Sequence, residues 1–167
     1  MTAERTPADV YEALAPAVLG YFRSQGVRDA EDLTGDVFVS VATGLGRFRG
    51  DEAALRRWVF TIARNRLIDD RRRGSRRQES IVADLPDIGG NDLALLDAEL
   101  RDDELFGALA ALTPEQREVI VLRFVADLPI DDVARIVGKR QGAIKMLQAR
   151  ALAELKRSLT VIDDHEA

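Results

Sequence analysis

Arginines dominate the chemistry that one segment of the chain offers. Residues 56–77 contain nine arginines and only two acidic residues. Arg57, Arg64 and Arg71 fall seven positions apart, so on a helix they share one face. Trp58 stands near the start of this segment, and an aromatic ring beside cations can stack on an unpaired base while the cations bind phosphate. The segment indicates nucleic-acid contact, although a core tryptophan beside a solvated arginine face fits the same pattern.

A second basic segment, near the C-terminus, has the spacing of a helix-turn-helix motif. Counted from Ile130, Ala134 is fifth, Val137 eighth, Gly138 ninth and Ile144 fifteenth. The small Ala134 allows two helices to cross closely, and Gly138 suits the turn because glycine tolerates left-handed backbone. Val137 and Ile144 would pack the two helices together, leaving the second free to enter the major groove of DNA. An ordinary helical bundle with a glycine turn is the alternative.

Catalytic chemistry finds little support. Adjacent aspartates occur, for example Asp69-Asp70 and Asp131-Asp132, but no nucleophile accompanies them and neighbouring helix residues point in different directions. Cysteine is absent, and the single histidine is His165 in a polar tail, so neither a thiolate metal site nor histidine acid–base chemistry is expected. We therefore expect no enzyme activity, no cofactor and no bound metal ion.

The charge of the chain is unevenly distributed. The 167 residues carry a net charge of −5, which opposes binding to DNA phosphates. Residues 79–112 hold nine acidic residues and one basic residue, so an acidic spacer separates two basic segments. We expect the free protein to bind duplex DNA weakly and to need a partner. No apolar run approaches the roughly 18 residues that span a bilayer, and the N-terminus lacks the apolar stretch of a signal peptide.

Apolar periodicity predicts helices along most of the chain, with no strand pattern and no internal repeat. Helices are expected over residues 8–25, 29–45, about 52–73, from near Asp92, 114–125, 130–137 and 141–158. Thr113, Pro114 and Gln116 form a capping box with proline at the first helical position. Glycines and a proline over residues 74–92 predict a linker. The expected fold is all-α, with two small helical domains joined by an acidic linker and a helix-turn-helix in the second.

Two long strings resemble the extracytoplasmic-function sigma factors of bacterial RNA polymerase, group four of the sigma-70 family. The resemblance to region two rests on DAEDLTGDVFVSVATGLGRFRGDEAALRRWVFTIARNRLIDDRRR, and that to region four on LTPEQREVIVLRFVADLPIDDVARIVGKRQGAIKMLQARALAELKRSL. WVFTIARNRLID is the most specific part. The resemblance implies a region-two domain over 1–77, an acidic linker over 78–108, a region-four domain over 109–160 and a polar tail over 161–167.

The resemblance also implies three sets of contact residues. Those matching the segment that docks on the clamp coiled coil of the largest polymerase subunit are Asp29, Asp32, Asp36 and Phe38. Those matching the segment that opens and reads the minus-ten promoter element are Phe48, Arg49, Gly50, Asp51, Trp58, Asn65, Arg66, Asp69 and Arg72. Those matching the reader of the minus-thirty-five element are Lys139, Arg140, Gln141, Lys145 and Arg150. Gln141 can read adenine and Arg140 guanine, whereas Arg150 suits a structural or phosphate contact.

Several positions depart from the family pattern. Gly35 stands where a glutamine is common in the clamp-binding segment, Arg140 replaces the usual serine cap of the recognition helix, and Leu147 replaces an arginine. The promoter preference of the common pattern is therefore not expected here.

The function implied is that of an alternative sigma factor. Such a protein binds core RNA polymerase, recognises minus-thirty-five and minus-ten elements and promotes DNA melting, and the partner places it in the cytoplasm without membrane contact of its own. Family resemblance further implies control by an anti-sigma factor that masks the polymerase-binding faces. The alternative is a conventional helix-turn-helix regulator that acts without core polymerase; it predicts self-association and duplex binding by the isolated chain.

Overall fold

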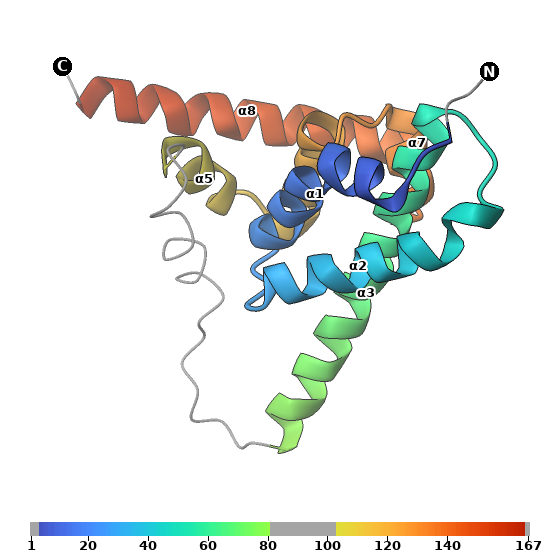
Figure 1. Cartoon of the computed structure of the whole chain (residues 1–167). Helices are drawn as coiled ribbons and strands as arrows, with labels where there is room; N and C mark the ends of the chain where they lie inside the picture. Colours follow the sequence, from blue (N-terminus) through green and yellow to red (C-terminus); the bar gives the residue numbers. More distant parts are fainter. Residues whose placement is uncertain (1–3, 81–102, 166–167) are drawn as a thin grey trace.

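The computed structural model describes residues 4–80 and 103–165, and regular structure within them is entirely helical (Figure 1). The first stretch holds α1 (Pro7–Ser24), α2 (Ala30–Gly44), the 3₁₀ helix η1 (Leu45–Arg47) and α3 (Glu52–Ser80). The second holds α5 (Asp103–Ala110), α6 (Pro114–Ile120), the π-helical segment η4 (Val121–Val125), α7 (Ile130–Val137) and α8 (Gln141–His165). The all-α prediction is confirmed. Most of the expected acidic linker, and the start of the helix expected near Asp92, lie outside the described residues.

Helix α1 begins at a capping box and ends before a glycine. The Thr6 hydroxyl accepts a hydrogen bond from the Asp9 N–H, and the Asp9 carboxylate accepts one from the Thr6 N–H, both at 3.1 Å. Pro7 fills the first helical position, where its missing N–H is no loss. Gly26 follows the helix with φ 74°, a backbone conformation that glycine adopts without strain. The apolar residues expected along one face are buried at Val10, Leu14, Val18 and Phe22.

Aromatic side chains fix α1 against α3. Tyr21 and Phe22 of α1 and Phe60 of α3 are fully buried. The Tyr21 and Phe60 rings meet nearly edge to face, with centroids 6.1 Å apart and an interplanar angle of 86°, a favourable arrangement for aromatic pairs. Val37 and Val41 of α2 belong to the same buried cluster. This core orients the exposed faces of α2 and α3.

Helix α3 is longer than its sequence predicts. A linker was expected from Gly74, but the helix continues to Ser80. A single glycine costs a helix only about 1 kcal/mol relative to alanine. Arginine, glutamine and glutamate, which are good helix formers, surround Gly74 and outweigh it. The predicted helix end at Arg73 is therefore wrong.

The helix-turn-helix forms at the expected residues. Gly138 closes α7 in the left-handed conformation, with φ 71° and ψ 34°, and its N–H donates to the Ala134 carbonyl at 2.9 Å. Ile144 is fully buried, and Val137 is partly buried against the same cluster. The Arg140 carbonyl accepts a hydrogen bond from the Ile144 N–H at 3.1 Å, so Arg140 begins the first turn of α8 through its backbone. The preceding helix starts at the predicted capping box but changes to π-helix at Val121.

The two halves of the chain pack against each other. One continuous buried cluster contains Val18 and Phe60 from the first half and Leu122 and Val133 from the second. Helix α1 contacts η4, and α3 contacts α7, as Figure 1 shows. A smaller buried cluster, which includes Leu109 of α5, holds α5 and α6 on α8. The region between the halves is therefore a packed interface.

Candidate nucleic-acid interfaces

Trp58 supports the loop that precedes α3. Its ring stacks on Phe48, with centroids 5.0 Å apart and an interplanar angle of 20°. On another side the indole lies so close to Gly44 that a Cβ there would be 2.9 Å from Trp58 Cζ2. Trp58 is half-buried, so it is neither a core residue nor a free platform for a base. It holds the loop over residues 45–51 at the head of α3.

Within this loop, several predicted DNA contacts also have structural roles. The Asp51 carboxylate accepts from the Ala54 N–H at 2.9 Å, which caps α3. Gly50 is crowded, because a Cβ there would be 2.8 Å from the Ala54 Cβ and 3.1 Å from a Phe48 ring carbon. Arg49 is exposed and donates to the Gly46 and Phe48 carbonyls at 3.1 and 2.9 Å. The sequence also indicated this cap, because Asp51 stands three residues before Ala54, from whose N–H it accepts a hydrogen bond. The family resemblance assigns Asp51 only to DNA contact and does not predict the cap.

The remaining residues predicted to contact the minus-ten element fall on α3. Trp58, Asn65 and Arg72 lie seven positions apart and so share one face, and Asn65, Asp69 and Arg72 are exposed. Arg66 differs, because its guanidinium donates to the Ser40 hydroxyl of α2 at 3.0 Å and is half-buried. The exposed stripe offers donors, acceptors and a cation, which is what reading and holding a nucleotide requires.

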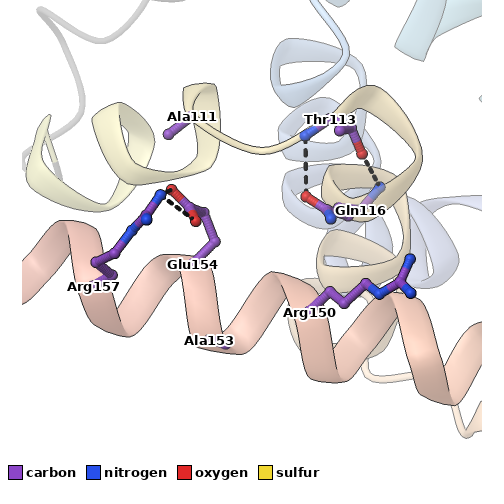
Figure 2. A pocket seen from close by; sticks show the side chains of 7 residues that line it. All are labelled: Ala111, Thr113, Gln116, Arg150, Ala153, Glu154 and Arg157. Atoms are coloured by element: carbon purple, nitrogen blue, oxygen red, sulfur yellow. Dashed lines mark hydrogen bonds and ion pairs between the residues drawn. The ribbon is translucent and has the colours of Figure 1, made fainter.

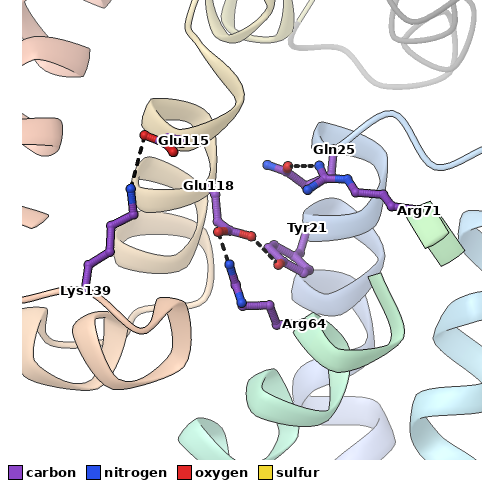
Figure 3. A network of polar contacts seen from close by, with 7 residues as sticks. All are labelled: Tyr21, Gln25, Arg64, Arg71, Glu115, Glu118 and Lys139. Atoms are coloured by element: carbon purple, nitrogen blue, oxygen red, sulfur yellow. Dashed lines mark hydrogen bonds and ion pairs between the residues drawn. The ribbon is translucent and has the colours of Figure 1, made fainter. Parts of the chain in front are cut away.

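The arginine row of α3 faces the second half of the chain and α1. Arg57 donates to Asp132 Oδ1 of α7 at 3.1 Å, and Arg64 donates to Glu118 Oε1 of α6 at 3.3 Å. Arg71 donates to the Gln25 side chain at 2.6 Å (Figure 3). Heptad spacing predicted the shared face correctly. In the structure this face meets the carboxylates of Asp132 and Glu118 and the neutral amide of Gln25; its contact with phosphate stays a prediction.

Glu118 is the centre of a buried polar network that sequence analysis did not identify. The Tyr21 hydroxyl donates to Glu118 Oε2 at 2.6 Å, and Arg64 reaches the other oxygen (Figure 3). Burial, and then the Glu118 charge, raise the pKa of the Tyr21 phenol well above its ordinary value, so the phenol stays neutral and donates. Arg117 spans the same interface, with its guanidinium donating to the Ser24 carbonyl at 3.1 Å; burial lowers its pKa from the ordinary arginine value.

The residues assigned to polymerase docking lie on α2. Asp29, Asp32 and Asp36 are exposed on this helix or at its N-terminus, where acidic side chains suit both the helix dipole and a basic partner. Phe38 is only 8% exposed and packs edge to face on Tyr11, with ring centroids 5.0 Å apart. The aromatic ring that this surface presents to solvent belongs to Tyr11, which is 52% exposed. Phe38 thus supports the exposed face of α2 from beneath.

The recognition helix presents its basic residues in two ways. Arg140, Gln141 and Lys145 are exposed in the first turns of α8. Lys139, just before them, is held by Glu115 at 3.1 Å. Arg150 lies farther along α8, beside the shallow hollow between α8 and the segment leading into α6 (Figure 2). The first turns therefore combine bidentate side chains with a free lysine charge, as expected of a major-groove reader.

Within residues 4–80 and 103–165, no group of three or more histidine, cysteine, aspartate or glutamate side chains could hold a metal ion. None of the helices described in these stretches is long and apolar enough to cross a membrane.

Family comparisons match both halves of the chain. Residues 10–77 match the family model for Sigma-70 region 2, and residues 108–157 match the family model for Sigma-70, region 4. The chain is 34% identical to the ECF RNA polymerase sigma factor BldN of Streptomyces coelicolor over 83% of its own length and spans 54% of that protein. It is 30% identical to the ECF RNA polymerase sigma factor ShbA of Streptomyces griseus, over 89% of this chain and 84% of ShbA.

Two solved structures resemble the fold of this chain. The sigma factor RpoE from Bartonella quintana, crystallised with the anti-sigma factor NepR, is 27% identical, with a TM-score of 0.71 over 92% of this chain and 96% of that one. CnrH, solved with the cytosolic domain of CnrY, shares the fold at 22% identity and a TM-score of 0.62, over 93% and 88% of the two chains.

Proposed function

Because the chain belongs to the extracytoplasmic-function family of RNA polymerase sigma factors, we propose that it binds core RNA polymerase and directs it to promoters. It recognises minus-thirty-five and minus-ten elements and promotes DNA melting at the start of transcription. The observation that carries this function is the order of two family regions, each with an exposed polar surface on a helix fixed by a core. The protein performs no covalent chemistry, requires no cofactor, and acts in the cytoplasm, where bacterial polymerase works.

On this proposal, α3 handles the minus-ten element. Asn65, Asp69 and Arg72 face the DNA, with Asn65 offering both a donor and an acceptor to a base edge. Trp58 and Phe48 hold the preceding loop in place, and the loop stabilises a flipped base whose unstacking costs a few kcal/mol. The stack at 5.0 Å makes loop and helix a single unit, so damage to either should impair melting more than polymerase binding.

The first turns of α8 read the minus-thirty-five element. Arg140 and Gln141 each can make paired contacts to a base edge, whereas Lys145 provides a point charge for phosphate. Arg150 lies too far along the helix to join them and contributes phosphate or structural contacts. Lys139 is tied to Glu115 at 3.1 Å and has a smaller role at the DNA.

Core polymerase docks on α2. Asp29, Asp32 and Asp36 offer negative charge to a basic helix of the polymerase, and the exposed Tyr11 adds an apolar contact beside them. An anti-sigma factor that covers this face would block docking and so regulate the protein.

Promoter-directed transcription by core polymerase tests this function. Purified core polymerase should yield discrete transcripts from a pool of genomic fragments only when this chain is added. Gel shifts of the same promoters should be weak with the chain alone and strong with the chain and core polymerase together. Tight sequence-specific binding by the isolated chain, with no new transcript in the presence of core polymerase, would instead support a conventional helix-turn-helix regulator.

A further inference from the structure

Arg5, in the segment that precedes α1, reaches the start of α3. Its Nε lies 2.8 Å from Glu52 Oε1, and its Nη1 donates to the Gly50 carbonyl oxygen at 3.3 Å. Arg5 and Gly50 are 45 positions apart in sequence, and Figure 1 shows the segment before α1, in dark blue, beside the N-terminal end of α3. One guanidinium therefore joins this segment both to the loop over residues 45–51 and to the first residue of α3.

The backbone that carries Arg5 is fixed by the residues that follow it. Thr6 is extended, with φ −87° and ψ 156°, as a residue before proline usually is. Its N–H and its hydroxyl are both bonded to Asp9 in the capping box, and α1 is packed on α3 through Tyr21 and Phe60. The Arg5 side chain is only 25% exposed. Arg5 thus extends from a rigid support and lies mostly covered against its partners.

The Gly50 contact holds the loop at a crowded point. A Cβ on Gly50 would lie 2.8 Å from Ala54 Cβ and 3.1 Å from Phe48 Cζ, so the Gly50 backbone lies directly against Phe48 and α3. Phe48 in turn stacks on Trp58. The loop is therefore held in two ways, by Trp58 through the Phe48 ring and by Arg5 through the Gly50 carbonyl.

The stability of α3 does not explain the position of Arg5. The N-terminal end of a helix carries partial positive charge, so a cation there is unfavourable, whereas an acid such as Glu52 is favourable. Glu52 is also 74% exposed, and an ion pair with so exposed a partner contributes little to folding. A forked guanidinium, however, fixes the relative positions of the two groups that it bonds. The geometry suits positioning of the loop better than stabilisation of the helix.

We propose that Arg5 is a positioning residue for the loop over residues 45–51, which it holds ready to receive a flipped promoter base. This inference rests on the proposed function, in which the loop contacts the minus-ten element. A loop that must be ordered on binding loses affinity, and a loop already held in its bound shape avoids that cost. Arg5 acts through the protein and does not itself bind DNA phosphate, because its charge is paired with Glu52.

Trp58 gives a direct readout of the loop in the free chain. It is the single tryptophan of the sequence, and its half-buried ring stacks on Phe48. We expect Arg5→Gln to raise the acrylamide quenching constant of Trp58 and to shift its emission to the red, because a loosened loop admits water to the ring. Tm should fall by less than about 4 °C, as expected for the loss of one ion pair with an exposed partner.

Arg157→Gln is the matched control. It is the same substitution and also breaks one ion pair, with Glu154 at 2.7 Å, but both residues lie on α8. It should leave the quenching of Trp58 and promoter opening near those of the unmodified protein.

Promoter opening with core polymerase tests the consequence of loop positioning. Arg5→Gln should lower the equilibrium constant for opening, measured by permanganate reactivity, by about 10-fold, the low end of the range for a hydrogen bond to a charged group. Glu52→Gln removes only the ion pair and should lower it by about 3-fold. The double variant should match Arg5→Gln, because Glu52 acts only through Arg5. Core-polymerase binding and the salt dependence of promoter affinity should not change.

The outcomes separate this inference from the function on which it rests. If the unmodified chain opens no promoter with core polymerase, the proposed function fails, and with it the role of Arg5 at promoters; the quenching of Trp58 in the free chain still shows whether Arg5 holds the loop. If the unmodified chain opens promoters and Arg5→Gln does so equally well, or leaves the quenching unchanged, positioning by Arg5 is refuted.

Two other results would also overturn the proposal. A gain in promoter affinity from Glu52→Gln, with a flatter salt dependence for Arg5→Gln, would show that Arg5 binds phosphate directly. Losses that add in the double variant would show that Arg5 and Glu52 act independently.

Discussion

The close approach of Gly44 to Trp58 makes Gly44→Ala a sharp test of how the loop over residues 45–51 is held. An alanine Cβ would lie 2.9 Å from Trp58 Cζ2 and 3.2 Å from Cη2, so the indole must move. The indole is not free to move outward, because it stacks on Phe48 at 5.0 Å. We therefore expect the substitution to displace the loop as well as the ring.

The magnitude follows from two opposing effects. Overpacking typically costs about 1–3 kcal/mol, whereas glycine to alanine stabilises by about 0.4–1 kcal/mol through the unfolded chain. The net loss in the free energy of unfolding is about 1–2 kcal/mol. In a protein of this size each kcal/mol lowers Tm by about 2–4 °C, so Tm should fall by about 2–8 °C. A similar loss of loop positioning would reduce the fraction of open promoter complex about 5- to 30-fold.

Gly46→Ala is the matched control. Gly46 lies two residues away in η1, and a Cβ there meets nothing within 4 Å. It should leave Tm and promoter opening near those of the unmodified protein. Thermal unfolding, permanganate footprinting of the open complex and binding to core polymerase are measured on both variants. Equal damage by Gly46→Ala would mean that chain flexibility, not contact with Trp58, is responsible; wild-type behaviour of Gly44→Ala would show that the loop does not depend on this packing.

Three further predictions concern the Asp51 cap of α3, Asn65 on the exposed stripe of α3, and the first turns of α8. Asp51→Ala removes the cap of α3, whose bond is 2.9 Å long, and should lower the free energy of unfolding by about 1 kcal/mol, measured by urea denaturation; an unchanged midpoint would refute the cap. Asn65→Ala should reduce permanganate reactivity of the melted region while leaving Tm and core binding intact, and normal melting would remove Asn65 from the site. Arg140→Ala or Gln141→Ala should change the upstream sequence selected from a randomised library, at about 1–3 kcal/mol for each lost paired contact, whereas Lys145→Ala should weaken all sequences alike and flatten the salt dependence by about one unit of slope. Selection of the wild-type sequence at wild-type strength by the first two variants would show that another part of α8 reads the element.

Local patterns predicted the local structure well. The spacing of Ala134, Gly138 and Ile144 fixed the helix-turn-helix because each position has a steric requirement that few residues meet. The capping box at Thr113 was equally predictable, since a cap involves residues only three positions apart; the similar box at Thr6 was not predicted. The extension of α3 past Gly74 was not predicted, because Gly74 was taken to end the helix without regard to the good helix formers on either side of it.

Long-range partners could not be predicted in this way. Heptad spacing shows that Arg57 and Arg64 share a face, but periodicity does not show what that face meets. Their partners, Asp132 and Glu118, are 75 and 54 positions distant, and such pairings depend on the tertiary fold. Phe38 illustrates the same limit, because a resemblance marks a position as important without separating a contact from the support beneath it.

The charge pattern and the fold together explain why a DNA-binding chain can carry a net charge of −5. Affinity for DNA depends on the number of phosphates that free cations neutralise. Arg57 is paired with Asp132 and Arg64 with Glu118, so the chain presents fewer free cations than its sequence contains. We therefore expect the chain to bind duplex DNA weakly when it is alone, because affinity falls with each cation that is already paired within the protein.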